Sequence, residues 1–144
     1  MRSGKVWLIG AGNMATDYAK ILIAQNIDFT AIGRSRENAI KMEDEVGVKI
    51  EYGGIEEFTK INKTIPESAI VSVGVEELYN TALCLLELGI KNILLEKPGA
   101  VDIKSLKKLK SIAKAKSVNL FIAYNRRCYA SVLKLKELIY NDGG

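Results

Sequence analysis

Apolar positions along the chain form six short runs separated by longer helical stripes. The runs lie at residues 6–9, 28–32, 48–52, 69–73, 92–95 and 120–123 and predict strands, because they are too short for globular helices. Between most of them, apolar residues recur every three or four positions, as in helices. Strands that alternate with helices pair in parallel through right-handed crossovers. The pattern therefore predicts an α/β fold with a doubly wound parallel (Rossmann) sheet in the strand order 3-2-1-4-5-6.

A glycine-rich turn and an apolar helix follow the first predicted strand. Gly10, Gly12 and Ala15 fit the pattern G-x-G-x-x-G/A, whose small residues permit the turn, the approach of a pyrophosphate and tight helix packing. Free N–H groups at Asn13 and Met14 would open the helix and attract a phosphate. The helix is apolar around most of its circumference, so we expect it to be buried. The alternative is a plain strand-turn-helix whose glycines serve only the turn.

The turn after the second predicted strand, Gly33-Arg34-Ser35-Arg36, bears on the choice of cofactor. In NAD-binding Rossmann domains, a carboxylate about 20 residues beyond the glycine motif accepts hydrogen bonds from the ribose 2′-OH. Here Gly33 occupies that place, and the two arginines would favour a 2′-phosphate. We therefore predict NADP(H) rather than NAD. Ser35 could instead only cap a helix at 35–46 while the arginines face water, although capping and phosphate binding are compatible.

The net charge of +4 does not indicate a nucleic-acid partner. Six lysines lie in one predicted helix, opposite its apolar stripe, which favours a solvated face. No aromatic residue lies among them to stack on bases. The chain has no histidine, so no site that needs imidazole can form, and no metal site is predicted. The lysines are Lys104, Lys107, Lys108, Lys110, Lys114 and Lys116.

Two cysteines, Cys84 and Cys128, have no CxxC spacing and lie in apolar helical patterns. This is typical of reduced core residues in a cytoplasmic protein. Polar residues and glycines interrupt the first apolar run before a signal-peptide core could form. No segment approaches the ~20 apolar residues of a membrane span. We therefore predict a cytoplasmic location without a membrane partner.

Two further motifs follow the fifth and sixth predicted strands: Glu96-Lys97-Pro98 and Tyr124-Asn125-Arg126-Arg127. Because they follow the carboxyl ends of strands, we expect both to face the ligand crevice. Together with the glycine motif, they resemble the N-terminal motifs of the Gfo/Idh/MocA family of NAD(P)-dependent sugar oxidoreductases, in the same order and spacing. The resemblance covers essentially the whole chain. Residues 93–99 and 122–132 are also similar to members encoded with polysaccharide biosynthesis enzymes.

The resemblance implies a catalytic role for Lys97, which corresponds to a family lysine between the nicotinamide and the substrate hydroxyl. The bond after this lysine is commonly a cis lysine-proline bond. Such a lysine could exchange a proton with a sugar hydroxyl while hydride moves to or from the ring. The alternative, which the sequence favours without the family match, is that Lys97 only pairs with Glu96 or solvent. The residues implied to line the cofactor at strand ends are Val73, Gly74, Glu96, Lys97, Asn125 and Arg126.

The chain departs from the family in two respects. Val73-Gly74-Val75 and Leu78 stand where Thr-Pro-Asn and a histidine are usual. Family members are also more than twice as long, and their second, open-sheet domain supplies the substrate pocket and the usual dimer face. We therefore expect residues 1–124 to form a dinucleotide-binding domain, and residues 125–144, with a helix at 128–140, to lead into a missing C-terminal domain that could form a homo-oligomer.

The sequence thus predicts the NADP(H)-binding domain of a sugar or nucleotide-sugar oxidoreductase, which binds cofactor but is catalytically incomplete alone. Its expected partner is a small-molecule sugar. The alternative is a stand-alone NADP-binding regulatory or redox-sensing module, which would not need Glu96-Lys97-Pro98. A short-chain dehydrogenase is disfavoured, since no tyrosine in the chain is followed by a lysine four positions later.

Overall fold

The computed structural model describes residues 6–142, in which six parallel strands form one sheet in the order β3-β2-β1-β4-β5-β6. The predicted fold class and strand order are confirmed. Strand ends differ from the predicted ones by at most two residues, and the third strand is the shortest. The strands are β1 (Val6–Ile9), β2 (Phe29–Ile32), β3 (Ile50–Glu51), β4 (Ser68–Val71), β5 (Asn92–Leu95) and β6 (Asn119–Ile122).

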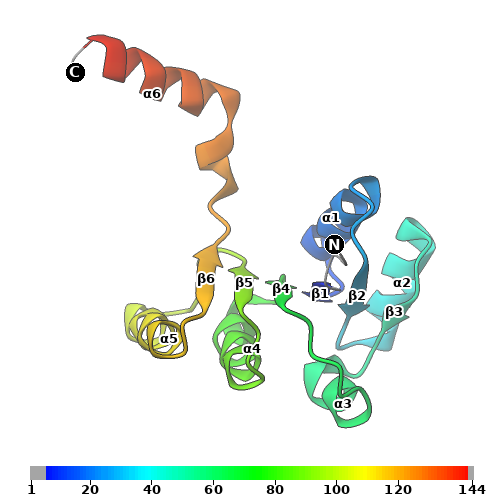
Figure 1. The fold of residues 1–144 in the computed structure, drawn as a ribbon. Helices are drawn as coiled ribbons and strands as arrows, with labels where there is room; N and C mark the ends of the chain where they lie inside the picture. Colours follow the sequence, from blue (N-terminus) through cyan, green and yellow to red (C-terminus); the bar gives the residue numbers. More distant parts are fainter. Residues whose placement is uncertain (1–5, 143–144) are drawn as a thin grey trace.

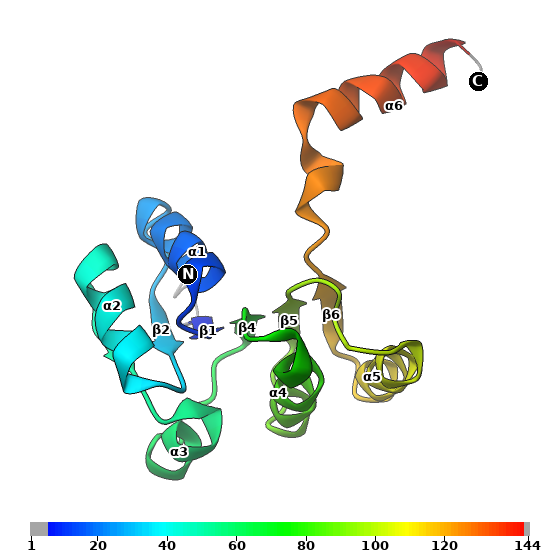
Figure 2. The same cartoon turned by 180° about the vertical axis from the view of Figure 1, so that it is seen from behind.

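Helices cover the sheet unevenly. In Figure 1, α1 and α2 lie on one face, and α3, α4 and α5 lie on the other; Figure 2 shows the same layers from behind. The chain therefore crosses from one face to the other between the first and second halves of the sheet. The helices are α1 (Asn13–Ala24), α2 (Arg36–Val46), α3 (Gly54–Ile61), α4 (Val75–Glu87), α5 (Ile103–Ala115), the 3₁₀ helix η1 (Asn125–Cys128) and α6 (Ala130–Asp142).

One hydrophobic core lies on each face of the sheet, because successive side chains on a strand point to opposite faces. In β1, Leu8 joins the core under α1 and α2, whereas Trp7 and Ile9 join the larger core under α3, α4 and α5. Trp7 is 1% exposed and contacts Phe58 of α3 edge to face, with ring centroids 5.5 Å apart. Burial on both faces explains why the strands read as continuous apolar runs.

Helix α1 is less buried than its composition predicts. Ala15, Ala19 and Leu22 are buried, but Ile21 and Ile23 are 51% and 40% exposed. The sheet covers only one side of this helix and α2 packs beside it, so its outer side reaches solvent. The expectation of an almost wholly buried helix was therefore wrong.

The segment after β6 leaves the body of the molecule, and α6 projects from it (Figure 1). Cys128 ends η1 and is exposed, so the expectation that it is a core residue was wrong; Cys84 of α4 is half-buried, and both cysteines are free. The predicted helix at 128–140 begins at Ala130 instead, because η1 precedes it.

The surface helices agree with the charge analysis. All six lysines of the predicted basic helix, five on α5 and Lys116 at its C-cap, are exposed, as expected of a solvated face. Within residues 6–142, none of the helices combines the length and hydropathy needed to cross a bilayer.

Candidate functional site

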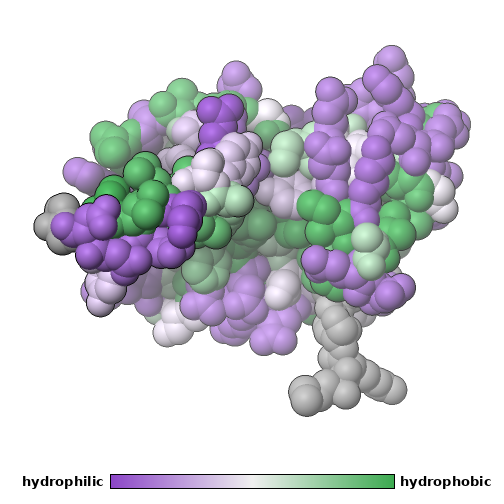
Figure 3. All heavy atoms as spheres, turned by 90° about the horizontal axis from the view of Figure 1, so that it is seen from above, coloured by the Kyte–Doolittle hydropathy of each residue, from purple (hydrophilic) through white to green (hydrophobic). Residues whose placement is uncertain are grey.

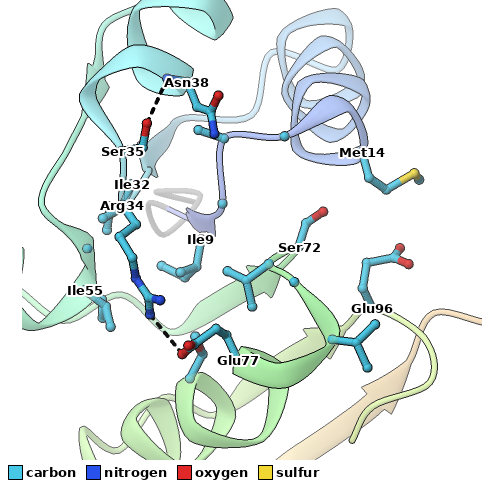
Figure 4. A pocket seen from close by; sticks show the side chains of 18 of the residues that line it. Ile9, Met14, Ile32, Arg34, Ser35, Asn38, Ile55, Ser72, Glu77 and Glu96 are labelled. Carbon is cyan, nitrogen blue, oxygen red and sulfur yellow. Dashed lines mark hydrogen bonds and ion pairs between the residues drawn. The ribbon is translucent and has the colours of Figure 1, made fainter. Parts of the chain in front are cut away.

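A cavity of about 710 Å³ lies where the winding of the sheet reverses, beyond the carboxyl ends of β1 and β4. From there β1 leads to α1 on one face and β4 leads to α4 on the other. Figure 4 shows the cavity between the beginnings of these two helices. Ligands of doubly wound folds bind at such a point, so the fold alone makes this cavity the candidate site.

Gly10 forms the sharp turn at the base of the cavity. Its φ is +129°, and a Cβ here would lie 2.1 Å from the carbonyl oxygen of Ser72. The close approach arises because β1 and β4 are neighbours, with the Ser72 N–H donating to the Ile9 carbonyl at 2.7 Å. Only glycine fits both the conformation and the space.

Gly12, by contrast, borders open space. No heavy atom lies within 4 Å of the position that its Cβ would take, and its φ of −95° suits any residue. Gly12 is also the N-cap of α1, where no side chain accepts a hydrogen bond from the first turn. No side chain therefore caps the N–H groups of the first turn at the cavity, and Gly12 leaves room for a ligand beside them.

The four other helices that pack against the sheet, α2 to α5, have occupied N-termini. Side chains cap α2 and α5, and the first turns of α3 and α4 each carry two glutamates. Helix α1 has neither a capping side chain nor an acidic residue in its first turn. The partial positive charge at its N-terminus is thus unneutralised where it borders the cavity, which favours an anion such as a phosphate.

One end of the cavity is bounded by the turn after β2. Ser35 caps α2 by accepting a hydrogen bond from the Asn38 N–H at 3.2 Å. The Arg34 guanidinium reaches across to α4, where its Nη2 lies 2.9 Å from Oε2 of Glu77 (Figure 4). This pairing raises the pKa of Arg34 and lowers the pKa of Glu77. Arg36 instead lies over the ring of Tyr52, 5.8 Å from its centroid.

The opposite end carries the turn after β5. The Tyr18 hydroxyl of α1 donates to Oε1 of Glu96 at 2.7 Å, and the Lys97 N–H donates to Oε2 of the same carboxylate at 3.2 Å. Burial, followed by the contact with Glu96, raises the pKa of Tyr18 far above its usual value. The Lys97–Pro98 bond is cis. Glu96 thus joins the helix that borders the cavity to the turn that carries Lys97.

The structure brings most of the predicted site residues together around this cavity. They are Gly10, Gly12, Asn13, Met14, Arg34, Ser35, Val73, Gly74, Glu96 and Lys97. Ala15 is buried within the first turn of α1, and Gly33 packs behind the cavity, where a Cβ would meet the Ala11 side chain at 2.8 Å. Arg36, Asn125 and Arg126 lie outside the lining; the last two belong to η1, beyond the end of β6.

Several lining residues were missed from the sequence. They are Ile9, Ala11, Ile32, Asn38, Gly54, Ile55, Glu56, Ser72, Val75, Glu77 and Thr81. Most lie at strand ends or in the first turn of a following helix, so their positions after β1, β2, β3 and β4 were the available signal. Glu77 gave no local signal, because its partner Arg34 is 43 residues away.

The residues present fit a dinucleotide better than a metal ion. The uncapped helix beside Gly12 offers N–H donors to a phosphate, and the cavity has polar groups at both ends. Within residues 6–142, no cluster of three or more His, Cys, Asp or Glu side chains is placed to hold a metal.

Comparison with solved structures shows the same fold in several oxidoreductases. An oxidoreductase from Agrobacterium radiobacter, solved with NAD+, L-tartaric acid and magnesium, has a TM-score of 0.84 at 15% identity, covering 98% of this chain and 41% of that one. The WlbA dehydrogenase from Bordetella pertussis, in complex with NADH and UDP-GlcNAcA, has a TM-score of 0.83 at 15% identity (97% and 43%). UDP-N-acetylglucosamine 3-dehydrogenase GnnA from Acidithiobacillus ferrooxidans has a TM-score of 0.78 at 16% identity (96% and 42%).

These comparisons also set the extent of the chain against its relatives. It spans about two fifths of the length of each of these solved structures. Among curated protein sequences, none matches significantly. The family model for the Gfo/Idh/MocA oxidoreductases, described as "Oxidoreductase family, NAD-binding Rossmann fold", matches residues 5–124. Since this match covers most of the 144 residues, the chain belongs to the Gfo/Idh/MocA oxidoreductase family and contains its NAD-binding Rossmann fold.

Proposed function

We propose that this chain is the NADP(H)-binding domain of an oxidoreductase that transfers hydride between the nicotinamide and a hydroxyl or carbonyl of a sugar or nucleotide sugar. The observation that carries the proposal is the uncapped first turn of α1 beside Gly12, at the edge of a cavity that has Arg34 at one end and Lys97 at the other.

Each part of the cavity has a role in this proposal. The N–H groups of Asn13 and Met14 hold the pyrophosphate, and Gly12 lets it approach the backbone. Arg34 and Ser35 take the 2′-phosphate, because the guanidinium and the hydroxyl are both hydrogen-bond donors at the end of β2. The nicotinamide end is left to the turn that carries Glu96 and Lys97.

The cofactor, when bound, supplies the hydride acceptor or donor. The chain's own contribution at that end is Lys97, whose ammonium can give a proton to a sugar oxygen or, once neutral, take one from it. Glu96 holds the backbone of this turn through its contact with the Lys97 N–H, and Tyr18 holds Glu96. The role of Lys97 is therefore supported by its place at the cavity, next to a carboxylate that is fixed at both oxygens.

The sugar class of the substrate is suggested by the solved relatives. One is named as a UDP-N-acetylglucosamine 3-dehydrogenase, and another was solved with UDP-GlcNAcA. Their fold and the shared family support a substrate of this chemical class for the whole protein, and a place in polysaccharide biosynthesis in the cytoplasm is the role that we propose.

We further propose that residues 1–124 form the cofactor domain and that α6 leads into a second, substrate-binding domain through which the protein can form a homo-oligomer. Helix α6 has no buried residue, and its exposed apolar side chains include Leu133, Leu135 and Ile139. Figure 3 views the molecule from above, with α6 nearest the viewer, and shows apolar side chains exposed on this helix. An isolated helix of 13 residues is marginal in water, so packing against another domain would stabilise it.

The test is calorimetric titration of the chain with NADPH and with NADH. We expect NADPH to bind more tightly, because a charge-assisted hydrogen bond contributes about 1.5–3 kcal/mol and the exposed Arg34 should lie near the lower end. Arg34→Ala should remove most of the difference and leave NADH affinity unchanged. Arg36→Ala is the matched control, since Arg36 lies over Tyr52 outside the cavity lining. Equal affinities, or a preference for NADH that persists in Arg34→Ala, would contradict the NADP(H) assignment.

A further inference from the structure

The ion pair between Arg34 and Glu77 connects two walls of the proposed cofactor cavity. Arg34 follows β2, Glu77 lies in the first turn of α4, and both line the cavity. Figure 4 shows the guanidinium extended towards the carboxylate. The two side chains are 63% and 38% exposed, so a ligand in the cavity can reach them. The contact therefore lies where an entering ligand would meet it.

A second carboxylate acts on the guanidinium. Glu56, at the beginning of α3, lines the same end of the cavity and raises the pKa of Arg34 further. The other arginine of the turn does not restore the balance, because Arg36 lies over the ring of Tyr52 outside the lining. One guanidinium thus shares this end of the cavity with two carboxylates, and only Glu77 contacts it directly.

We propose that Glu77 is a specificity-determining residue of the cofactor site, which weakens NADPH binding relative to NADH by holding the guanidinium that a 2′-phosphate needs. The inference rests on the proposed NADP(H) function. A 2′-phosphate must displace the Glu77 carboxylate from Arg34 and then sit close to that unpaired negative charge. The neutral 2′-OH of NADH meets neither cost, so Glu77 acts on the difference between the two cofactors.

Glu76 provides a matched control within the same helical turn. It carries the same charge and also lies in the first turn of α4, but it is exposed and does not line the cavity. A general effect of removing a negative charge from this turn would therefore appear in both Glu76→Gln and Glu77→Gln. An effect of the contact with Arg34 would appear only in Glu77→Gln.

The experiment measures dissociation constants for NADPH and NADH by calorimetry in the wild-type chain, Glu77→Gln and Glu76→Gln. An exposed charge contact of this kind corresponds to a change of about twofold to fivefold in affinity. We expect Glu77→Gln to bind NADPH more tightly by this factor, with NADH unchanged, and Glu76→Gln to resemble the wild type. The gain should shrink at high salt, because exposed charges are screened. In an Arg34→Ala background, most of the gain should be lost.

The outcomes separate this inference from the function on which it rests. If the wild-type chain binds neither dinucleotide, both fail. If it prefers NADPH but Glu77→Gln leaves that affinity unchanged or weakens it, the proposed function stands and the inference is overturned; weaker binding would mean that Glu77 orients Arg34 for the phosphate. Equal gains in Glu76→Gln and Glu77→Gln would also overturn it. Melting temperatures of all variants show whether each is folded.

Discussion

Gly10 and Gly12 belong to one sequence motif, but the structure predicts opposite consequences when each is replaced by alanine. Gly10 has a φ of +129° and no room for a Cβ, whereas Gly12 has a common backbone conformation and open space around it. Gly10→Ala should therefore damage the fold. Gly12→Ala should leave the fold intact and affect only what enters the cavity.

The magnitude for Gly10→Ala has two parts. A residue with a side chain held in this backbone region costs about 1–3 kcal/mol. The new methyl group would also lie 2.1 Å from a backbone oxygen of Ser72, so the ends of β1 and β4 must separate and strain the hydrogen bond from Ser72 to Ile9. That bond contributes about 1 kcal/mol. The loss of about 2–4 kcal/mol in unfolding free energy corresponds to a melting temperature roughly 10 °C lower.

For Gly12→Ala, the expected change in unfolding free energy is within about 0.5 kcal/mol. The methyl group would project at a cavity-lining position beside the uncapped N-terminus of α1. If a pyrophosphate approaches the backbone there, affinity should fall about tenfold or more, which equals about 1.4 kcal/mol per tenfold.

Urea unfolding and calorimetric titration with NADPH measure both effects on the same samples. The wild-type chain is the reference for folding. The control for binding is Gly47→Ala, since Gly47 at the C-cap of α2 has a φ of +71° and lies away from the cavity. A Gly10→Ala chain with wild-type stability would refute the steric argument. Undiminished NADPH binding by Gly12→Ala would refute the placement of the pyrophosphate.

Two further predictions concern Tyr18, which contacts the turn after β5, and Lys97, which lies in that turn. Tyr18→Phe removes one donor from Glu96 and should lower the unfolding free energy by about 1 kcal/mol in urea titrations near neutral pH. Because the pKa of Tyr18 is raised in the folded state, the stability that Tyr18 contributes is complete below about pH 10 and is lost as the pH rises further. Above about pH 10, the unfolding free energy of the wild type should therefore fall more steeply with pH than that of Tyr18→Phe. Equal slopes would contradict this. The chain alone should bind NADPH but show no sugar-dependent change in its absorbance, since Lys97 is exposed and a sugar carbon must be held within ~3–3.5 Å of the nicotinamide. Lys97→Ala should leave NADPH affinity nearly unchanged, and robust sugar oxidation by residues 1–144 would contradict the prediction.

The fold could be predicted from the sequence because its signals are local and repeated. Each strand is a short apolar run, each intervening segment is compatible with a helix, and the handedness of the crossovers leaves few arrangements of a parallel sheet. The strand order was correct for this reason, and strand ends differed by at most two residues. Burial was harder to predict. Ile21 and Ile23 are apolar but exposed, since the sheet and α2 cover only part of the surface of α1.

The site could be predicted where one turn forms it and not where distant segments meet. Gly10 and Gly12 act through the backbone of their own turn, so their pattern located the cavity. The contact from Tyr18 to Glu96 joins residues 78 positions apart, and no local pattern predicts it. The expectation that Asn125 and Arg126 face the cavity rested on their place after the carboxyl end of β6. The chain after β6 does not turn towards the cavity and continues instead into η1, outside the lining.

The turn after β2 shows that charges near one another in the sequence do not determine the net charge of the site to which they belong. In the sequence, the turn after β2 has two arginines and no acidic residue between them, which favours the binding of a phosphate. In the folded chain, Arg36 lies over Tyr52 outside the lining. Arg34 lines the cavity, pairs with Glu77 of α4 and shares this end with Glu56 of α3. The local balance changes from two positive charges to one positive and two negative charges. We infer that the preference for a 2′-phosphate depends on how readily it replaces Glu77 at Arg34, which makes that single contact the place where the cofactor choice of this chain can be changed by substitution.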